Sequence, residues 1–103
     1  MKFEYNGHLD FNERISFVAK DIKNAYSEIS DVDAKKIAAL EPKIINKLNF
    51  NMLFNRLYNI LLVEKNNYKI FNRVYNDLMN ICKNNTLDDK HIEKLSFIDK
   101  LIN

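Results

Sequence analysis

Apolar residues recur along this chain at alternating spacings of three and four, which is the period of an amphipathic α-helix. The first such stripe lies in residues 10–29, where charged and polar side chains separate its members. These members are Phe11, Ile15, Val18, Ile22, Ala25 and Ile29. Asp10, followed three residues later by Glu13, matches the capping box that begins many helices. The pattern therefore predicts a first helix over residues 10–29.

A short second helix is predicted over about residues 32–40. Ser30 or Asp31 is its expected cap, because both side chains accept a hydrogen bond from a free backbone N–H. Pro42 ends this helix, since proline lacks an N–H and crowds the preceding turn. Proline is accepted in the first turn of a helix, so we expect a third helix to begin at Pro42.

The third predicted helix spans residues 42–63, either without interruption or with a pause at residues 49–51. The clearest loop is the polar run at 64–67, which reads EKNN. Beyond this loop, the apolar spacing predicts a fourth helix over residues 68–83. Its buried stripe is expected to contain Phe71, Val74, Leu78 and Ile81.

A fifth helix is predicted after Thr86, its expected cap, with Asp88 and Asp89 in the first turn, where the helix dipole favours carboxylates. Its expected buried residues are Ile92, Leu95, Ile98 and Ile102. Residues 1–9 are expected to form a short extended arm. A single glycine and a single proline leave little turn chemistry for strands. The sequence therefore predicts an all-α fold, an antiparallel bundle of four to five helices in a single domain, residues 1–103.

Composition and charge exclude some function classes. A net charge of +2 with scattered basic residues indicates neither a nucleic-acid partner nor an anionic membrane surface. The longest apolar run, residues 60–63, is far shorter than the roughly 20 residues that span a bilayer. The N-terminus lacks the apolar segment of a secretory signal, and Cys82, alone in the sequence, cannot form an intramolecular disulfide. We therefore expect a cytoplasmic protein.

Few residues are candidates for catalysis or metal binding. Cys82 beside Lys83 could have a lowered pKa, but it borders the apolar stripe of the fourth helix and is interpreted as a small buried hydrophobic residue. His91 near Asp88 lacks the spacing of a metal-ligating helix and is interpreted as an exposed side chain. A single glycine cannot form a glycine-rich phosphate loop. The sequence therefore predicts no catalytic, cofactor-binding or metal-binding residue, and a protein that is not an enzyme.

Two other features indicate binding. Residues 33–40 are similar to the first helix of a helix-turn-helix motif, but Glu41 and Pro42 replace the tight turn, so a DNA-binding regulator is the lesser alternative. Tyrosines fall within or beside the hairpin of the third and fourth helices, where they suit either a protein-contact surface or the edge of a bundle. These tyrosines are Tyr58, Tyr68 and Tyr75.

The second half of the chain resembles the pediocin-like (class IIa) bacteriocin immunity proteins. The similar segments are LFNRLYNIL at 53–61, NYKI at 67–70, VYNDL at 74–78, KNNTLD at 83–88 and IEKL at 92–95. The resemblance covers residues 53–102. It implies a cytosolic, antiparallel four-helix bundle from a low-GC Gram-positive bacterium. It also implies a protein without enzymatic activity that protects the producer by recognising the bacteriocin on its membrane receptor, the mannose phosphotransferase permease.

In that family, specificity lies in the C-terminal half, so the resemblance implies a recognition surface on the outward faces of the fourth and fifth helices. The partner-binding residues expected there are Tyr75, Lys83, Lys90, Lys94 and Lys100. The leading hypothesis is therefore a protein-binding module that confers bacteriocin immunity. The alternative is a phage or mobile-element inhibitor that blocks a host or defence protein, in the manner of an anti-CRISPR protein.

Overall fold

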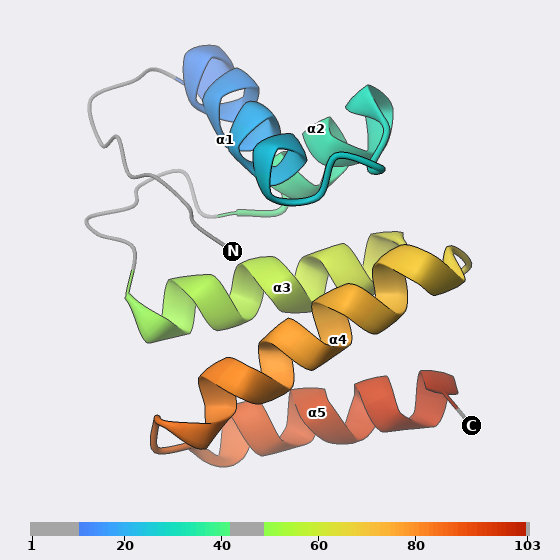
Figure 1. The fold of residues 1–103 in the computed structure, drawn as a ribbon. Helices are drawn as coiled ribbons and strands as arrows, with labels where there is room; N and C mark the ends of the chain where they lie inside the picture. Colours follow the sequence, from blue (N-terminus) through green and yellow to red (C-terminus); the bar gives the residue numbers. More distant parts are fainter. Residues whose placement is uncertain (1–10, 42–48, 103) are drawn as a thin grey trace.

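The structure, a computed structural model, describes residues 11–41 and 49–102. In these two ranges the chain forms five helices and no strand, which confirms the predicted all-α bundle (Figure 1). The helices are α1 (Phe11–Ala25), α2 (Asp31–Ala39), α3 (Phe50–Val63), α4 (Tyr68–Lys83) and α5 (Asp89–Ile102). The predicted arm over residues 1–9, the capping residue Asp10 and the helical start at Pro42 lie outside the described residues.

α3 lies in the middle of the bundle (Figure 1). α1 and α2 pack against each other on one side of α3, and α4 runs antiparallel to α3 on the other side. α5 lies beyond α4 in this view and runs in the same direction as α3. The core between these helices contains mainly aliphatic side chains, with Tyr26, Phe54 and Phe71 as its aromatic members.

Side-chain caps fix where the helices begin. Ser30 Oγ accepts a hydrogen bond from the backbone N–H of Asp33 at 3.1 Å, so Ser30, and not Asp31, caps α2. Asn49 is extended, with φ −98° and ψ −177°, and its Oδ1 accepts from the Met52 N–H at 3.0 Å. Asn49 is therefore the N-cap of α3. The third helix begins at Phe50, and no helix continues through residue 49.

The predicted end of the first helix is wrong. α1 ends at Ala25, four residues before Ile29, yet Tyr26 and Ile29 are both buried. The chain turns after α1, and the Tyr26 hydroxyl donates to Asp77 Oδ2 on α4 at 2.6 Å. Periodicity therefore identified Ile29 as a core residue, but a turn rather than a helix positions it, and the buried Tyr26 lies outside the predicted stripe.

The fifth helix differs from the prediction at both its cap and its core. Its cap is Asp88, whose Oδ1 accepts from the His91 N–H at 3.0 Å, so the expectation for Thr86 is wrong. Ile98 is buried, but Ile92 and Ile102 are each 52% exposed and were wrongly assigned to the core. The reason is that His91, with Ile98 seven residues later, forms the inward face and turns Ile92 toward solvent.

A buried charge network connects α3 to the α1–α2 pair. Arg56 Nη1 donates to Asp21 Oδ2 at 3.0 Å, and its Nη2 donates to Glu41 Oε2 at 3.0 Å. All three side chains are buried. The apolar pattern did not predict this burial, because Arg56 reads as an interruption of an apolar stripe. Through Arg56, α3 contacts the α1–α2 pair on one side, while it packs against α4 on the other.

Candidate protein-contact surface on α3 and α5

Two hollows flank the solvent-facing side of α3. One, of about 430 Å³, lies between α3 and α5, and the other, of about 220 Å³, lies between α3 and the end of α2. The first is lined by Tyr58, Lys90, Glu93, Lys94 and Phe97. The second is lined by Leu40, Glu41, Met52, Asn55, Asn59 and Lys94. We call these residues together the Lys94 surface, because Lys94 lines both hollows.

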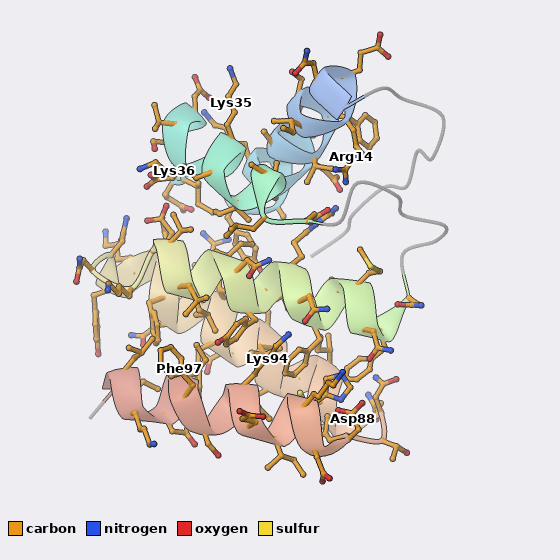
Figure 2. All side chains as sticks on the ribbon, turned by 180° about the vertical axis from the view of Figure 1, so that it is seen from behind. Arg14, Lys35, Lys36, Asp88, Lys94 and Phe97 are labelled. Atoms are coloured by element: carbon orange, nitrogen blue, oxygen red, sulfur yellow. The ribbon has the colours of Figure 1, made fainter. Side chains whose placement is uncertain are left out.

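Lys94 reaches from α5 onto α3 (Figure 2). Its Nζ donates to Asn55 Oδ1 at 2.7 Å and lies 5.2 Å from the centroid of the Tyr58 ring. Both contacts are with neutral groups, and among the described residues the Lys94 ammonium forms no ion pair. The result is a half-buried positive charge held in a fixed position by an amide and an aromatic face.

The Lys94 surface contains exposed apolar side chains. Phe97 is 47% exposed and Leu40 is 54% exposed, while Met52 and Tyr58 are half-buried. Partial burial, together with the nearby carboxylate of Glu93, raises the pKa of the Tyr58 phenol. Tyr58 is therefore a neutral hydroxyl at physiological pH, able to donate or accept a hydrogen bond at the edge of an apolar patch.

Of the five residues expected to bind a partner, the structure places Lys90 and Lys94 together in this surface. Lys94 is not on the outward face of α5, because its side chain turns toward α3. Tyr75 is half-buried: its ring stacks on Phe71, and its hydroxyl donates to Asp99 Oδ1 at 3.2 Å. The remaining two residues, Lys83 and Lys100, are exposed and line neither hollow.

The prediction missed Phe97, Met52 and Asn55. A signal for Phe97 was present in the sequence, because Lys90, Lys94 and Phe97 follow one another at helical spacings of four and three. This second stripe lies beside the core stripe of α5 and places an exposed aromatic ring next to two lysines. No comparable local signal identifies the α3 residues, since their exposure depends on where α2 and α5 pack.

The prediction that His91 is exposed is wrong. His91 is buried against Phe54 and Phe50, with ring centroids 4.6 Å and 5.2 Å away. Its Nδ1 accepts from the Asp88 N–H at 3.1 Å, so Nε2 carries the proton and donates to Asn51 Oδ1 at 2.8 Å. His91 thus fixes the beginning of α5 against the beginning of α3.

Within the described part of the chain, no group of three His, Cys, Asp or Glu side chains is placed to hold a metal ion.

Cys82 is a half-buried free thiol, and burial raises its pKa. The neighbouring Lys83 therefore does not produce the lowered pKa that a nucleophilic thiolate needs. The environment of Cys82 agrees with its interpretation as a small hydrophobic residue that packs against the core.

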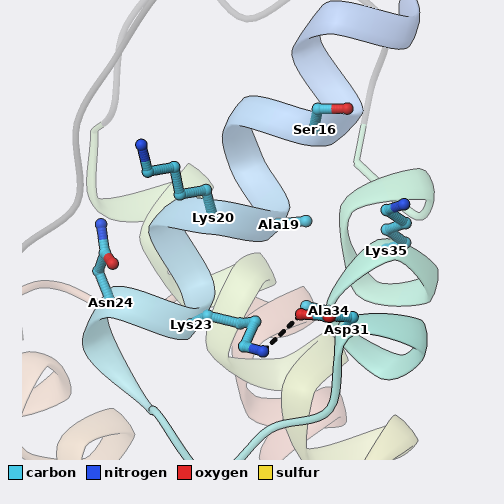
Figure 3. Close-up of a pocket in the computed structure, with 8 residues that line it drawn as sticks. All are labelled: Ser16, Ala19, Lys20, Lys23, Asn24, Asp31, Ala34 and Lys35. Atoms are coloured by element: carbon cyan, nitrogen blue, oxygen red, sulfur yellow. Dashed lines mark hydrogen bonds and ion pairs between the residues drawn. The ribbon is translucent and has the colours of Figure 1, made fainter.

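A further hollow, of about 350 Å³, lies between α1 and α2 (Figure 3). Ala19 and Ala34 lie where the two helices approach each other, and Lys20, Lys23 and Lys35 line its edges. Lys23 forms an ion pair with Asp31, whose pKa is lowered by that contact. Lys20 and Lys35 are exposed, and the half-buried Lys23 is paired with Asp31, so this hollow lacks the half-buried ammonium without an ion pair that distinguishes the Lys94 surface.

Among the helices that the structure describes, none is both long enough and apolar enough to cross a membrane. Comparison of the chain with protein-family models, with curated proteins and with solved structures found no match. The resemblance to the class IIa immunity proteins therefore rests on the sequence segments alone.

Proposed function

We propose that this protein is a non-catalytic protein-binding module and that the Lys94 surface is its contact surface. The observation that carries the proposal is the exposed Phe97 ring beside Tyr58 and the fixed Lys94 ammonium. Protein interfaces concentrate aromatic side chains and methionine at their centres, within a rim of polar groups. The Lys94 surface has this composition, with Asn55 and Asn59 as polar neighbours of Met52.

In its most concrete form, the proposed activity is bacteriocin immunity in the cytoplasm of the producing cell. The segments that resemble the class IIa immunity proteins span residues 53–102, which include most of α3 and all of α4 and α5. The Lys94 surface is built mainly from two of these helices, α3 and α5. The proposed partner is accordingly the bacteriocin engaged with its membrane receptor, and recognition would involve Lys90 and Lys94 from the predicted set.

Protection of cells tests this proposal directly. The chain is expressed in a bacteriocin-sensitive Gram-positive strain, and a panel of class IIa peptides is titrated. We expect the inhibitory concentration to rise selectively for one or a few peptides. Phe97→Ala should remove most of that rise, whereas Tyr68→Ala should leave it intact, because Tyr68 is exposed on α4 and lines neither hollow of the Lys94 surface.

Two further variants distinguish the Lys94 surface from the rest of the set expected from the sequence. Lys83→Ala and Lys100→Ala should both leave protection unchanged, since neither residue lines the hollows. An absence of protection across the panel, with the protein well expressed and folded, would contradict immunity. The inhibitor alternative would then be tested by binding to soluble complexes from the host, again with Phe97→Ala as the diagnostic variant.

A further inference from the structure

We infer that the partner segment is an amphipathic helix that presents an Asp or Glu carboxylate to Lys94 between two apolar side chains, one for each hollow. This inference rests on the proposed function and specifies the chemistry of the partner. It starts from the single side chain that the two hollows share.

The Lys94 ammonium has donors that can bind an acidic group. An ammonium group has three N–H donors, and the Asn55 amide oxygen accepts one of them. Its other fixed contact is the face of the Tyr58 ring, which attracts a cation but leaves its charge uncompensated. A carboxylate placed at the open side of Lys94 would accept charge-assisted hydrogen bonds, the strongest contact available to this group.

Other charged groups line both hollows around Lys94. Glu41 lines the smaller hollow, but its carboxylate is buried and both of its oxygens accept hydrogen bonds from Arg56, which also contacts Asp21. Lys90 adds a second positive charge in the larger hollow, where Glu93 is the acidic lining residue. In the larger hollow two lysines face one carboxylate, which favours an acidic partner, and Glu93 directs the partner carboxylate toward the Asn55 side of Lys94.

The distance between the two hollows suits a helical partner. Met52 and Tyr58, one in each hollow, are six residues apart on α3, which corresponds to about 9 Å along the helix axis and about 120° around it, or roughly 10 Å between their Cα atoms. Two apolar side chains separated by seven residues on a partner helix lie about 10.5 Å apart, with the residue at the third or fourth position between them on the same face. A leucine in each hollow and an acid opposite Lys94 therefore fit one helical face, the usual mode by which a helix binds in a groove.

A pair of synthetic helical peptides tests the inference. Both are acetylated, amidated and about 18 residues long, with leucines seven positions apart; one carries Glu midway between them, and the other carries Gln. Each is titrated into the ¹⁵N-labelled full chain and followed by NMR. We expect the Glu peptide to shift the side-chain amide of Asn55 and the backbone signals of Tyr58 and Phe97. The Gln peptide should bind at least tenfold more weakly.

Protein variants complete the test. Lys94→Gln should weaken binding of the Glu peptide at least tenfold and remove the difference between the two peptides. Lys69→Gln, a change to an exposed lysine of α4, should not alter either affinity. Circular dichroism shows whether Lys94→Gln is folded. If it is not, the two peptides on the natural chain still decide the question, because they differ only in the carboxylate.

Equal affinity of the two peptides would overturn the inference, as would no binding at millimolar concentration or shifts confined to the α1–α2 hollow. The protection assay is read without either peptide, so the two proposals fail separately. Protection that depends on Phe97 but not on Lys94 would retain the contact surface and reject the acidic partner. Absence of protection together with selective binding of the Glu peptide would reject immunity and retain the contact chemistry.

Discussion

Arg56 holds the Glu41 carboxylate by both of its oxygens: Nη2 donates to Oε2 at 3.0 Å, and Nε donates to Oε1. A third donor, Nη1, contacts Asp21 on α1. The three side chains are buried together, although isolated charges are costly to remove from water. Arg56 therefore donates to two carboxylates at once and connects α3 to α1 and to the end of α2.

Arg56→Ala should destabilise the protein strongly. The substitution leaves Asp21 and Glu41 buried without their guanidinium, and breaking a buried ion pair from one side costs about 3–5 kcal/mol. Urea denaturation monitored by circular dichroism measures the free energy of unfolding. Lys36→Ala is the matched control, because Lys36 is exposed and its loss should cost less than about 0.5 kcal/mol. A loss below 1 kcal/mol for Arg56→Ala would show that the network contributes little.

Glu64 should make stability depend on pH. Its carboxyl is buried at the end of α3, and burial, together with a hydrogen bond and the negative charge of Asp33, raises its pKa to about 7. The folded chain thus retains a proton that the unfolded chain releases near pH 4.5. The free energy of unfolding should fall as pH rises from about 4.5 through 7.

The variant Glu64→Gln isolates this effect. Glutamine does not ionise, so the decline in the free energy of unfolding between pH 5 and pH 8 should become shallower and the variant should be more stable than the natural chain at pH 8. Glu93→Gln is the control, since Glu93 is exposed and its replacement should leave the slope unchanged. Thermal unfolding at a series of pH values gives both slopes. Parallel curves for the natural chain and Glu64→Gln would exclude this role of Glu64.

His91→Ala should cost about 2–4 kcal/mol of the free energy of unfolding. The change opens a cavity beside Phe50 and Phe54 and leaves Asn51 without its imidazole partner. The neighbouring substitution Ile92→Ala should cost less than about 1 kcal/mol, because Ile92 is half open to solvent. Chemical denaturation of the two variants compares them directly, and similar losses would show that His91 is not a packing residue.

Leu57→Asp should unfold the chain, whereas Ile92→Asp should not. Leu57 is completely buried, so the aspartate would place an uncompensated charge in the core, at a cost of about 4 kcal/mol or more. Far-UV circular dichroism and the dispersion of the NMR spectrum report the fold. A Leu57→Asp chain that stays helical and well dispersed would contradict the packing of α3 described above.

The sequence by itself determined the fold class and the position of several helices. The expected fourth helix, residues 68–83, coincides with α4, and the second helix differs by one residue at each end. These boundaries depend on local chemistry: the Ser30 and Asn67 side chains cap the backbone three residues ahead, and the apolar period selects the buried face. A cap involves residues within one helical turn, and the apolar period repeats along a single helix. Both signals can therefore be recognised without knowledge of the tertiary structure.

Only the tertiary structure decided which side chains of ambiguous character are buried. His91 is covered by Phe50 and Phe54, about forty residues earlier in the chain, while the more hydrophobic Ile92 is exposed. Lys94 was expected on an outward face, yet it lies against Asn55 and joins two hollows. Periodicity indicates that a helix has an inner face, but the direction of that face depends on the neighbouring helices. Long-range packing, rather than local pattern, therefore created the Lys94 surface.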